Sequence, residues 1–286
     1  MPELPEVETI RRDLAKVLIG KKIKSVDISL SKIVRNDDDE FVNIIQGAKF
    51  TAIERVGKLL IFKVSTKYYL LIHLKMTGQL IYKDKKIGVG GGHTQRALEG
   101  TLPGKHTHVT FAFNDGSKLF FNDLRRFGYL HLVEGAMKDI VRSKYGPEPT
   151  AKNFTSSYFH QLLKGKRSSI KAVLLNQKWI AGLGNIYVDE ACFLAGVRPA
   201  RTAGTLNKRQ AEALWKSCRQ VIAEGIKYRG TTFSNYLDGL GKRGGYSKKL
   251  KVFGRQGKAC LRCKRGVITK MRVAGRGTHY CPLCQK

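Results

Sequence analysis

The chain begins with Met1-Pro2-Glu3-Leu4-Pro5-Glu6-Val7-Glu8, an acidic segment that leads directly into an amphipathic pattern. Apolar residues follow at positions 7, 10, 14, 17 and 18, which is the spacing of one face of an α-helix, and Gly20 marks its end. The sequence therefore predicts a helix that packs one face against a core and presents Pro2 at its leading end.

Pro2 becomes the amino terminus if Met1 is removed. An α-amino group has a pKa near ~8, against ~10.4 for a lysine, so more of it is neutral and nucleophilic at neutral pH. Such an amine can attack an electrophilic carbon, and Glu3 or Glu6 can carry the protons. The alternative interpretation is structural, because prolines rigidify a helix start and glutamates stabilise its dipole. On this segment alone the structural interpretation is favoured.

The charge of the chain indicates a polyanionic partner. Its 286 residues include 53 Lys and Arg against 22 Asp and Glu, a net charge of +31. Nucleic acid is the simplest partner for such an excess. No apolar run approaches the ~20 residues of a spanning helix, and no signal-peptide pattern is found, so we expect no membrane partner and a reducing compartment. There, cysteines serve metals or packing rather than disulfides.

Between Lys22 and Val133 the pattern changes to short β-branched and aromatic runs, which predict an antiparallel β-sandwich or barrel. The glycine-rich segment 87–104 predicts a flexible surface loop, and the acidic residues 37–40 predict a solvated turn. The expected strands are 24–30, 49–56, 59–64, 68–74, 108–113 and 118–121, with a hairpin turn at 114–117.

Helical patterns dominate after the proline-containing segment 146–149. The expected helices are 153–163, 169–176, 186–195 and 207–227, and residues 229–249 are expected to form a long loop. This organisation predicts a β-rich domain with its leading helix at 1–134, a linker at 135–150, a helical domain at 151–249 and a metal-binding finger at 250–286.

The end of the chain carries the most specific local signal. Cys260-x-x-Cys263 and Cys281-x-x-Cys284 are separated by residues 264–280, a spacing typical of a four-cysteine site for one structural Zn²⁺. Two disulfides or four free thiols are the alternatives, and a reducing compartment disfavours the disulfides. Residues 242–286 carry no Asp or Glu among their many Lys and Arg, so this finger suits phosphate binding. Cys192 and Cys218 are expected to be core residues.

Two further motifs are suited to DNA. Ile180-Ala181-Gly182-Leu183-Gly184-Asn185-Ile186-Tyr187 places glycines and an Asn at a helix start, which can seat a phosphate, although a plain hairpin of two helices explains it equally well. Asn122-Asp123-Leu124-Arg125-Arg126-Phe127-Gly128 and His73-Leu74-Lys75-Met76-Thr77-Gly78 place a long apolar side chain beside a cation, as in proteins that unstack DNA. Alternatively, Met76 and Phe127 are core residues. Lys58 and Lys171 are predicted to be solvated.

Taken together, these motifs resemble the formamidopyrimidine-DNA glycosylase family of base-excision repair enzymes. The likeness covers nearly the whole chain, from the N-terminal Pro-Glu and the turn at Met76 to Arg125-Arg126-Phe127-Gly128, Gly182-Leu183-Gly184-Asn185-Ile186-Tyr187 and a finger with Gly275-Arg276-Gly277-Thr278. It implies an α+β multidomain fold: an N-terminal antiparallel β-sandwich with a leading helix, a helix–two-turn–helix domain and a C-terminal four-cysteine zinc finger.

The resemblance also implies an activity. A DNA-formamidopyrimidine glycosylase with DNA-(apurinic or apyrimidinic site) lyase activity excises oxidised purines, 8-oxoguanine and formamidopyrimidines, from double-stranded DNA. It does so through an imine at the N-terminal proline, followed by β,δ-elimination. We expect a monomeric, cytoplasmic, nucleoid-associated protein of bacterial type that acts on DNA with oxidised bases or abasic sites. The alternatives are an oxidised-pyrimidine glycosylase of the sister branch and a non-catalytic zinc-finger protein that binds DNA.

The resemblance assigns roles to individual residues. Pro2 is the expected nucleophile and Glu3 its acid/base partner, while Glu6 and Lys58 support the chemistry. The expected DNA-binding residues are Met76, His106, Arg125, Phe127, Lys171, Asn185 and Arg276, with Arg125 facing the orphaned cytosine; the expected zinc ligands are Cys260, Cys263, Cys281 and Cys284. The segment near 230–246 is expected to cover the lesion, whereas residues 88–104 depart from the family pattern.

Overall fold

The computed structural model describes residues 1–85, 88–93, 102–231, 236–237 and 244–286. The chain forms two compact units. The first contains Met1–Ser143 and Tyr228–Gly245, and the second contains Lys144–Lys227 and Tyr246–Lys286. Part of the predicted loop at 87–104 and part of the predicted lesion-covering segment at 230–246 lie outside the described residues.

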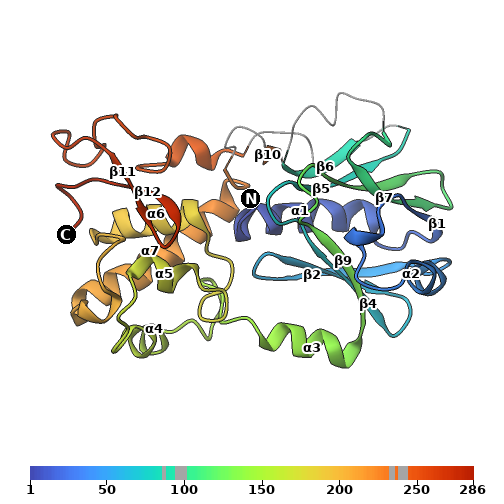
Figure 1. The fold of residues 1–286 in the computed structure, drawn as a ribbon, viewed down its shortest axis with the longest axis horizontal. Coiled ribbons are helices and arrows are strands. Elements are labelled where there is room, and N and C mark those ends of the chain that lie inside the picture. The colour runs from blue at the N-terminus through green and yellow to red at the C-terminus, as the bar shows by residue number, and fades with distance from the viewer. Residues whose placement is uncertain (86–87, 94–101, 232–235, 238–243) are drawn as a thin grey trace. The chain divides into compact units, whose positions relative to one another are not determined.

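The first unit is a sandwich of two sheets in which all neighbouring strands are antiparallel, which confirms the predicted fold (Figure 1). One sheet contains, in spatial order, β1 (Ile23–Ile28), β7 (Thr107–Phe113), β8 (Lys118–Asp123), β5 (Gly78–Lys83), β6 (Gly88–His93) and β10 (Tyr236–Leu237). The other contains β2 (Phe50–Val56), β3 (Leu59–Val64), β4 (Tyr68–His73) and β9 (Tyr129–Glu134).

Helix α1 (Leu4–Leu18) supplies one wall of the sandwich core, as its periodicity predicts. Val7, Ile10, Leu14 and Leu18 are buried in one cluster with side chains of both sheets. On another side of the helix, Glu8 accepts hydrogen bonds from Arg11 and Arg12 and from Arg55 of β2. Burial alone would raise the pKa of Glu8, but these contacts outweigh it and lower the pKa to about 2. This network fixes the start of α1 against the second sheet.

The acidic segment 37–40 was predicted as a solvated turn; Asp37, Asp39 and Glu40 are exposed, but residues 38–40 belong to a helix, so the prediction of a turn is wrong. Asp37 caps helix α2 (Asp38–Ile45), and its carboxylate accepts the N–H groups of Asp39 and Glu40 at 3.0 and 3.1 Å. Carboxylates at the cap and in the first turn favour a helix start. Phe41 and Ile45, one turn apart, are then buried in the core.

The glycine-rich segment also differs from its prediction, because Gly88–His93 forms strand β6 rather than a flexible loop. The strand passes so close to α1 that a Cβ on Gly91 would lie 2.4 Å from Cγ1 of Ile10. Close packing against the helix therefore requires glycine at this position. A run of glycines suggested a flexible loop, but here it allows a strand to lie against a helix.

Apart from α2, β6 and the short strand β10, three elements of the first unit lie outside the helix and strand ranges named in the sequence analysis. They are β5, β9 and helix α3 (Gly135–Ser143), which lies in the segment expected to be a linker; a short 3₁₀ turn, η1, spans Ser31–Ile33. Strand β5 is buried at five consecutive positions, so it lacks the alternation that marks a half-exposed strand.

The second unit contains helices close to those predicted. They are α4 (Ser156–Leu163), α5 (Ile170–Leu175), α6 (Asn185–Ala195) and α7 (Lys208–Lys227), with 3₁₀ turns η2 (Ala203–Thr205) and η3 (Tyr246–Lys249) and the hairpin β11 (Thr269–Val273) and β12 (Arg276–Tyr280). Buried Glu190 of α6 accepts the N–H groups of residues 251–253, each at 2.9 Å, which attaches the segment before the finger to the helices. Cys192 and Cys218 are buried core residues, as predicted.

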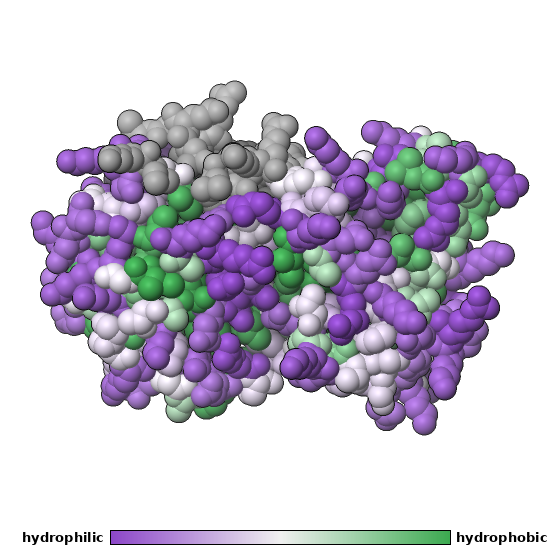
Figure 2. Space-filling model, turned by 180° about the vertical axis from the view of Figure 1, so that it is seen from behind, coloured by the Kyte–Doolittle hydropathy of each residue, from purple (hydrophilic) through white to green (hydrophobic). Residues whose placement is uncertain are grey.

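The face drawn in Figure 2 is covered largely by hydrophilic residues, with apolar residues in smaller patches. No helix in the described part of the chain is long and apolar enough to cross a bilayer.

Candidate active site and nucleic-acid interface

Four of the predicted site residues lie around the start of α1: Glu3, Glu6, Lys58 and Arg125. Glu3 and Glu6 are both only 2% exposed, and the Glu6 carboxylate accepts the backbone N–H of Glu3 at 3.0 Å. Burial lowers the pKa of the Met1 α-amino group below its ordinary value; the cations of Lys58 and Arg125 lower it further, while Glu3 and Glu6 oppose the shift. The amino terminus is therefore surrounded by two carboxylates and two cations, a setting that keeps more of it neutral.

Glu6 has a second role that the sequence did not indicate. Its Oε1 accepts the backbone N–H of Thr231 at 2.7 Å and the Thr231 hydroxyl at 3.1 Å. Gly230 lies so close that a Cβ there would be 2.7 Å from the same oxygen. One buried carboxylate thus joins the start of α1 to the described beginning of the segment expected to cover a lesion.

Lys58 was predicted to be solvated, and that prediction is wrong, because only 6% of it is exposed. It follows Gly57 in the turn between β2 and β3. The Gly57 carbonyl accepts a hydrogen bond from Arg55, whose guanidinium also donates to Glu8 of α1. This network places the turn beside the start of the helix. The positive charge of Lys58 therefore helps to lower the pKa of the α-amino group.

The two motifs predicted to unstack DNA, 73–78 and 122–128, form turns, here called the wedge turns, that adjoin each other where β5 begins and β8 ends. Phe127 is 53% exposed, which contradicts the alternative that it is a core residue, and the Arg125 guanidinium lies 4.7 Å from the centre of its ring. Met76, in the turn before β5, is half-buried. Exposed apolar and cationic side chains on adjacent turns can enter a base stack together.

Asp123, at the end of β8, holds these turns together. Fully buried, it accepts hydrogen bonds from the Thr77 hydroxyl, from the Arg125 N–H at 3.1 Å and from the Gly128 N–H at 2.7 Å. The carboxylate thereby fixes the turn of Met76 against the turn that carries Arg125 and Phe127. The sequence motif contained Asp123 but gave no sign of this function.

We predict that Asp123→Ala destabilises the protein by about 3 kcal/mol, because it leaves the buried Gly128 N–H and the Thr77 hydroxyl without their acceptor. Urea denaturation followed by circular dichroism measures this loss. Asp27→Ala, which removes an exposed carboxylate from β1 of the same sheet, is the matched control and should be near neutral. Equal stability of the two variants would contradict the assigned role of Asp123.

Two histidines lie near these turns. His73 was quoted within a motif but not assigned a role; burial, then the cations of Lys75, Lys58 and Arg35, lower its pKa to about 3. Its Nδ1 accepts the Lys75 N–H at 3.0 Å, so the hydrogen of the neutral ring is on Nε2. A neutral donor among lysines suits a phosphate oxygen. His106 is half-buried, and its carbonyl accepts the Asp123 N–H at 2.9 Å, which places it beside the wedge turns.

In the second unit, Asn185 and Lys171 meet at one carbonyl of the finger hairpin. Asn185 begins α6, and its Nδ2 donates to the Gly277 carbonyl at 3.0 Å. Lys171 was also predicted to be solvated, yet it is completely buried; its Nζ lies 2.5 Å from Asp189 Oδ1 and 3.3 Å from the same carbonyl. The ion pair with Asp189 compensates its desolvation. Arg276, adjacent to this anchored carbonyl, is exposed.

The four predicted metal ligands form one cluster. The sulfur atoms of Cys260, Cys263, Cys281 and Cys284 all lie within 4.8 Å of one another, and none is in a disulfide. Two of the separations are 3.7 and 3.9 Å, close to the ~3.8 Å between sulfurs in a tetrahedral site with Zn–S bonds of ~2.3 Å. Gly266 leaves the space that the sulfurs need, because a Cβ there would be 2.8 Å from the Cys281 sulfur. These residues fit a structural four-thiolate metal site.

The first unit is a β-sandwich with buried Glu3 and Glu6 beside its amino terminus and with exposed residues on the wedge turns. The same chain carries helices and a basic four-cysteine finger. Together these features define a zinc-finger DNA glycosylase. Family models agree. Residues 1–130 match the formamidopyrimidine-DNA glycosylase N-terminal domain, residues 145–236 match the H2TH domain of the same family, and residues 257–286 match a zinc finger found in FPG and IleRS. The chain belongs to the formamidopyrimidine-DNA glycosylase family.

Individual relatives support the assignment. Formamidopyrimidine-DNA glycosylases of Carboxydothermus hydrogenoformans and Pelotomaculum thermopropionicum are 42% and 40% identical to this chain; both alignments cover 100% of it and 100% and 99% of the relatives. Two Lactococcus lactis Fpg structures, one with DNA containing N7-benzyl-Fapy-dG and one with abasic-site DNA, are 34% identical with TM-scores of 0.88 and 0.87. They match 100% and 99% of each chain.

Proposed function

We propose that this protein is a bifunctional DNA glycosylase and AP lyase that excises 8-oxoguanine and formamidopyrimidines from duplex DNA, with Pro2 as its nucleophile after loss of Met1. The observation that carries the proposal is the setting of the amino terminus, where Glu3 and Glu6 are buried and where burial and the cations of Lys58 and Arg125 lower the pKa of the Met1 α-amino group, one residue before Pro2. An amine kept neutral beside a carboxylate is the arrangement that nucleophilic attack requires.

The chemistry then follows in four steps. The Pro2 nitrogen attacks C1′ of the extruded nucleotide, the bond from C1′ to the base breaks, and the base leaves with a proton. Glu3 protonates the sugar ring oxygen as the ring opens to a cationic iminium. The iminium acidifies C2′, so loss of a C2′ proton expels the 3′ phosphate. A second elimination expels the 5′ phosphate. A secondary amine suits this route because its iminium is cationic without protonation.

The remaining site residues grip the DNA. Met76, Arg125 and Phe127 occupy the gap left by the extruded base, with Arg125 facing the orphaned cytosine. Asn185 and Arg276 hold phosphates flanking the lesion. His106 binds DNA beside the wedge turns. Lys171 acts indirectly, because it is buried and anchors the hairpin through Gly277. The four cysteines hold one structural Zn²⁺, and the protein works as a monomer in a bacterial cytoplasm.

Substrate comparison tests the proposed lesion class. Duplexes with 8-oxoguanine opposite cytosine should be cleaved at least about tenfold faster than duplexes with thymine glycol, because one pocket discriminates between the two shapes. Gel-resolved single-turnover rates measure the ratio, and an abasic-site duplex controls for lyase competence. A preference for thymine glycol would assign the protein to the oxidised-pyrimidine branch instead.

A further inference from the structure

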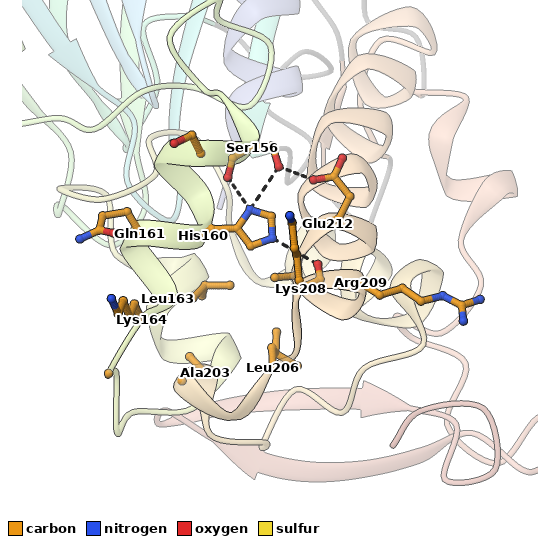
Figure 3. A pocket seen from close by; sticks show the side chains of 14 residues that line it. Ser156, His160, Gln161, Leu163, Lys164, Ala203, Leu206, Lys208, Arg209 and Glu212 are labelled. Carbon is orange, nitrogen blue, oxygen red and sulfur yellow. Dashed lines mark hydrogen bonds between the residues drawn. The ribbon is translucent and has the colours of Figure 1, made fainter.

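The second unit contains a groove that none of the roles above uses. It has a volume of about 970 Å³ and lies between α4 and the first turns of α7, with the η2 turn at one end (Figure 3). Its lining residues come from α4 and the turn after it, from the η2 turn and from the start of α7.

The groove combines an apolar floor with a basic rim. Leu163, Ala203 and Ala211 form buried parts of the floor, and half-buried Leu206 adds to it. Three exposed cations stand at the rim: Lys164, Lys208 and Arg209. Within the part of the chain that the structure describes, none of these three side chains is in ion-pair contact with a carboxylate.

The single acid of the lining, Glu212, is already engaged. Its carboxylate accepts the Ser156 hydroxyl and lies 3.5 Å from Lys216, and these contacts lower the pKa of Glu212. His160 of α4 links the two walls through its Nε2, which lies 3.2 Å from the Lys208 carbonyl at the start of α7, while its Nδ1 lies 2.8 Å from the Ser156 carbonyl of its own helix. Figure 3 shows the two bonds that cross from α4 to α7, from Ser156 to Glu212 and from His160 to the Lys208 carbonyl. These two bonds fix the spacing of the groove walls.

We propose that this groove docks an acidic segment of a partner protein that carries apolar side chains. Apolar side chains of the segment would cover Leu163 and Leu206, and its carboxylates would pair with the rim cations. Nucleic acid fits less well, because the lining has no Phe, Tyr or Trp on which bases could stack. A second copy of this chain is disfavoured by its net charge of +31.

Fluorescence anisotropy with a labelled peptide, Asp-Leu-Asp-Asp-Leu-Phe, tests the proposal on the full chain. The peptide should bind the wild-type protein, and the double variant Lys208→Glu, Arg209→Glu should bind it at least about tenfold more weakly. Lys152→Glu, an exposed lysine of the same unit outside the groove, is the matched control and should bind nearly as well as wild type. The milder pair Lys164→Ala, Lys208→Ala gives a second measurement if charge reversal impairs folding.

Further measurements separate this groove from general attraction to a basic protein. A peptide with Ser in place of Leu and Phe should bind at least about tenfold more weakly, because the floor contributes apolar contact. Equal binding of the two peptides, equal binding by the double variant, or displacement of the peptide by duplex DNA would each overturn the proposal. Cleavage of lesion DNA by the double variant should stay at the wild-type rate, so a failed peptide test leaves the proposed glycosylase function standing.

Discussion

Replacement of Pro2 by glycine is expected to reduce the borohydride-trapped covalent adduct between protein and lesion DNA by more than about a hundredfold, which corresponds to about 2.7 kcal/mol of transition-state stabilisation. The variant keeps an amino terminus, but its primary amine gives an imine that must gain a proton before it can draw electrons from C2′. Proline gives a cationic iminium at once. Denaturing gel electrophoresis of reactions reduced with borohydride measures the adduct.

Pro5→Ala is the matched control for this experiment, because it alters the other proline of the same segment without touching the amine. It should retain most of the adduct, since the second helix position tolerates alanine. Mass measurement of each purified protein must first show that Met1 is absent. Wild-type adduct yield from Pro2→Gly, or no adduct from processed wild-type protein, would falsify the role of Pro2.

The same amine predicts a pH dependence. At the same position the pKa of the Met1 α-amino group is lowered by burial and then by Lys58 and Arg125, against Glu3 and Glu6, and we expect the Pro2 amine to be shifted in the same direction. Because only the neutral form attacks, the rate of adduct formation should rise with pH and level off, with its midpoint below the ordinary value of 8.0. Lys58→Met removes one of these cations and should move the midpoint upward. An unchanged midpoint would show that Lys58 does not act on the amine.

Removal of the finger metal is expected to weaken DNA binding by more than about a hundredfold while the β-sandwich stays folded. Metal binding by a four-cysteine finger is coupled to its folding, so metal loss should release the hairpin that carries Arg276. The sandwich has its own core, formed by α1, α2 and both sheets, and should keep its unfolding temperature. A chelator titration tests this prediction. A metal-sensitive dye measures the metal released, fluorescence anisotropy measures the affinity for DNA, and circular dichroism measures the unfolding temperature of the sandwich.

Cys281→Ser and Cys218→Ala form a matched pair for this prediction. Both residues are buried cysteines of the second unit, but only Cys281 belongs to the metal cluster. The first variant should lose metal and DNA affinity, whereas the second should keep both. If the metal-free protein binds DNA as tightly as before, or if the sandwich unfolds at the same chelator concentration, the finger does not have the proposed role in DNA binding.

The two lysines predicted to be solvated show where sequence patterns mislead in this chain. Among 53 basic residues, neither Lys58 nor Lys171 has a local feature that separates it from a surface lysine. Burial of Lys171 becomes tolerable only because Asp189, on the next helix, supplies a carboxylate and Gly277 supplies a carbonyl. Charge composition predicts a polyanion as partner, but it does not say which cations face that partner.

Features with a local physical cause could be predicted from the amino-acid sequence. The period of α1 follows from side chains one turn apart, the strand 59–64 from a short apolar run, and the metal site from two pairs of cysteines that each present two sulfurs from one turn. The family motifs also lie within short segments, so the sequence alone is enough to name Pro2, Arg125 and Asn185 as candidate site residues.

The way in which those local features are joined depends on the folded chain. Asp123 meets Thr77 across 46 residues, Glu6 meets Thr231 across 225, and Asn185 meets Gly277 across 92. Each contact depends on a buried polar group that needs a partner, and the partner is supplied by chain topology rather than by any neighbouring residue. For that reason the candidate residues of the active site can be named from the sequence, while the residues that hold them in place are identified only by the tertiary contacts.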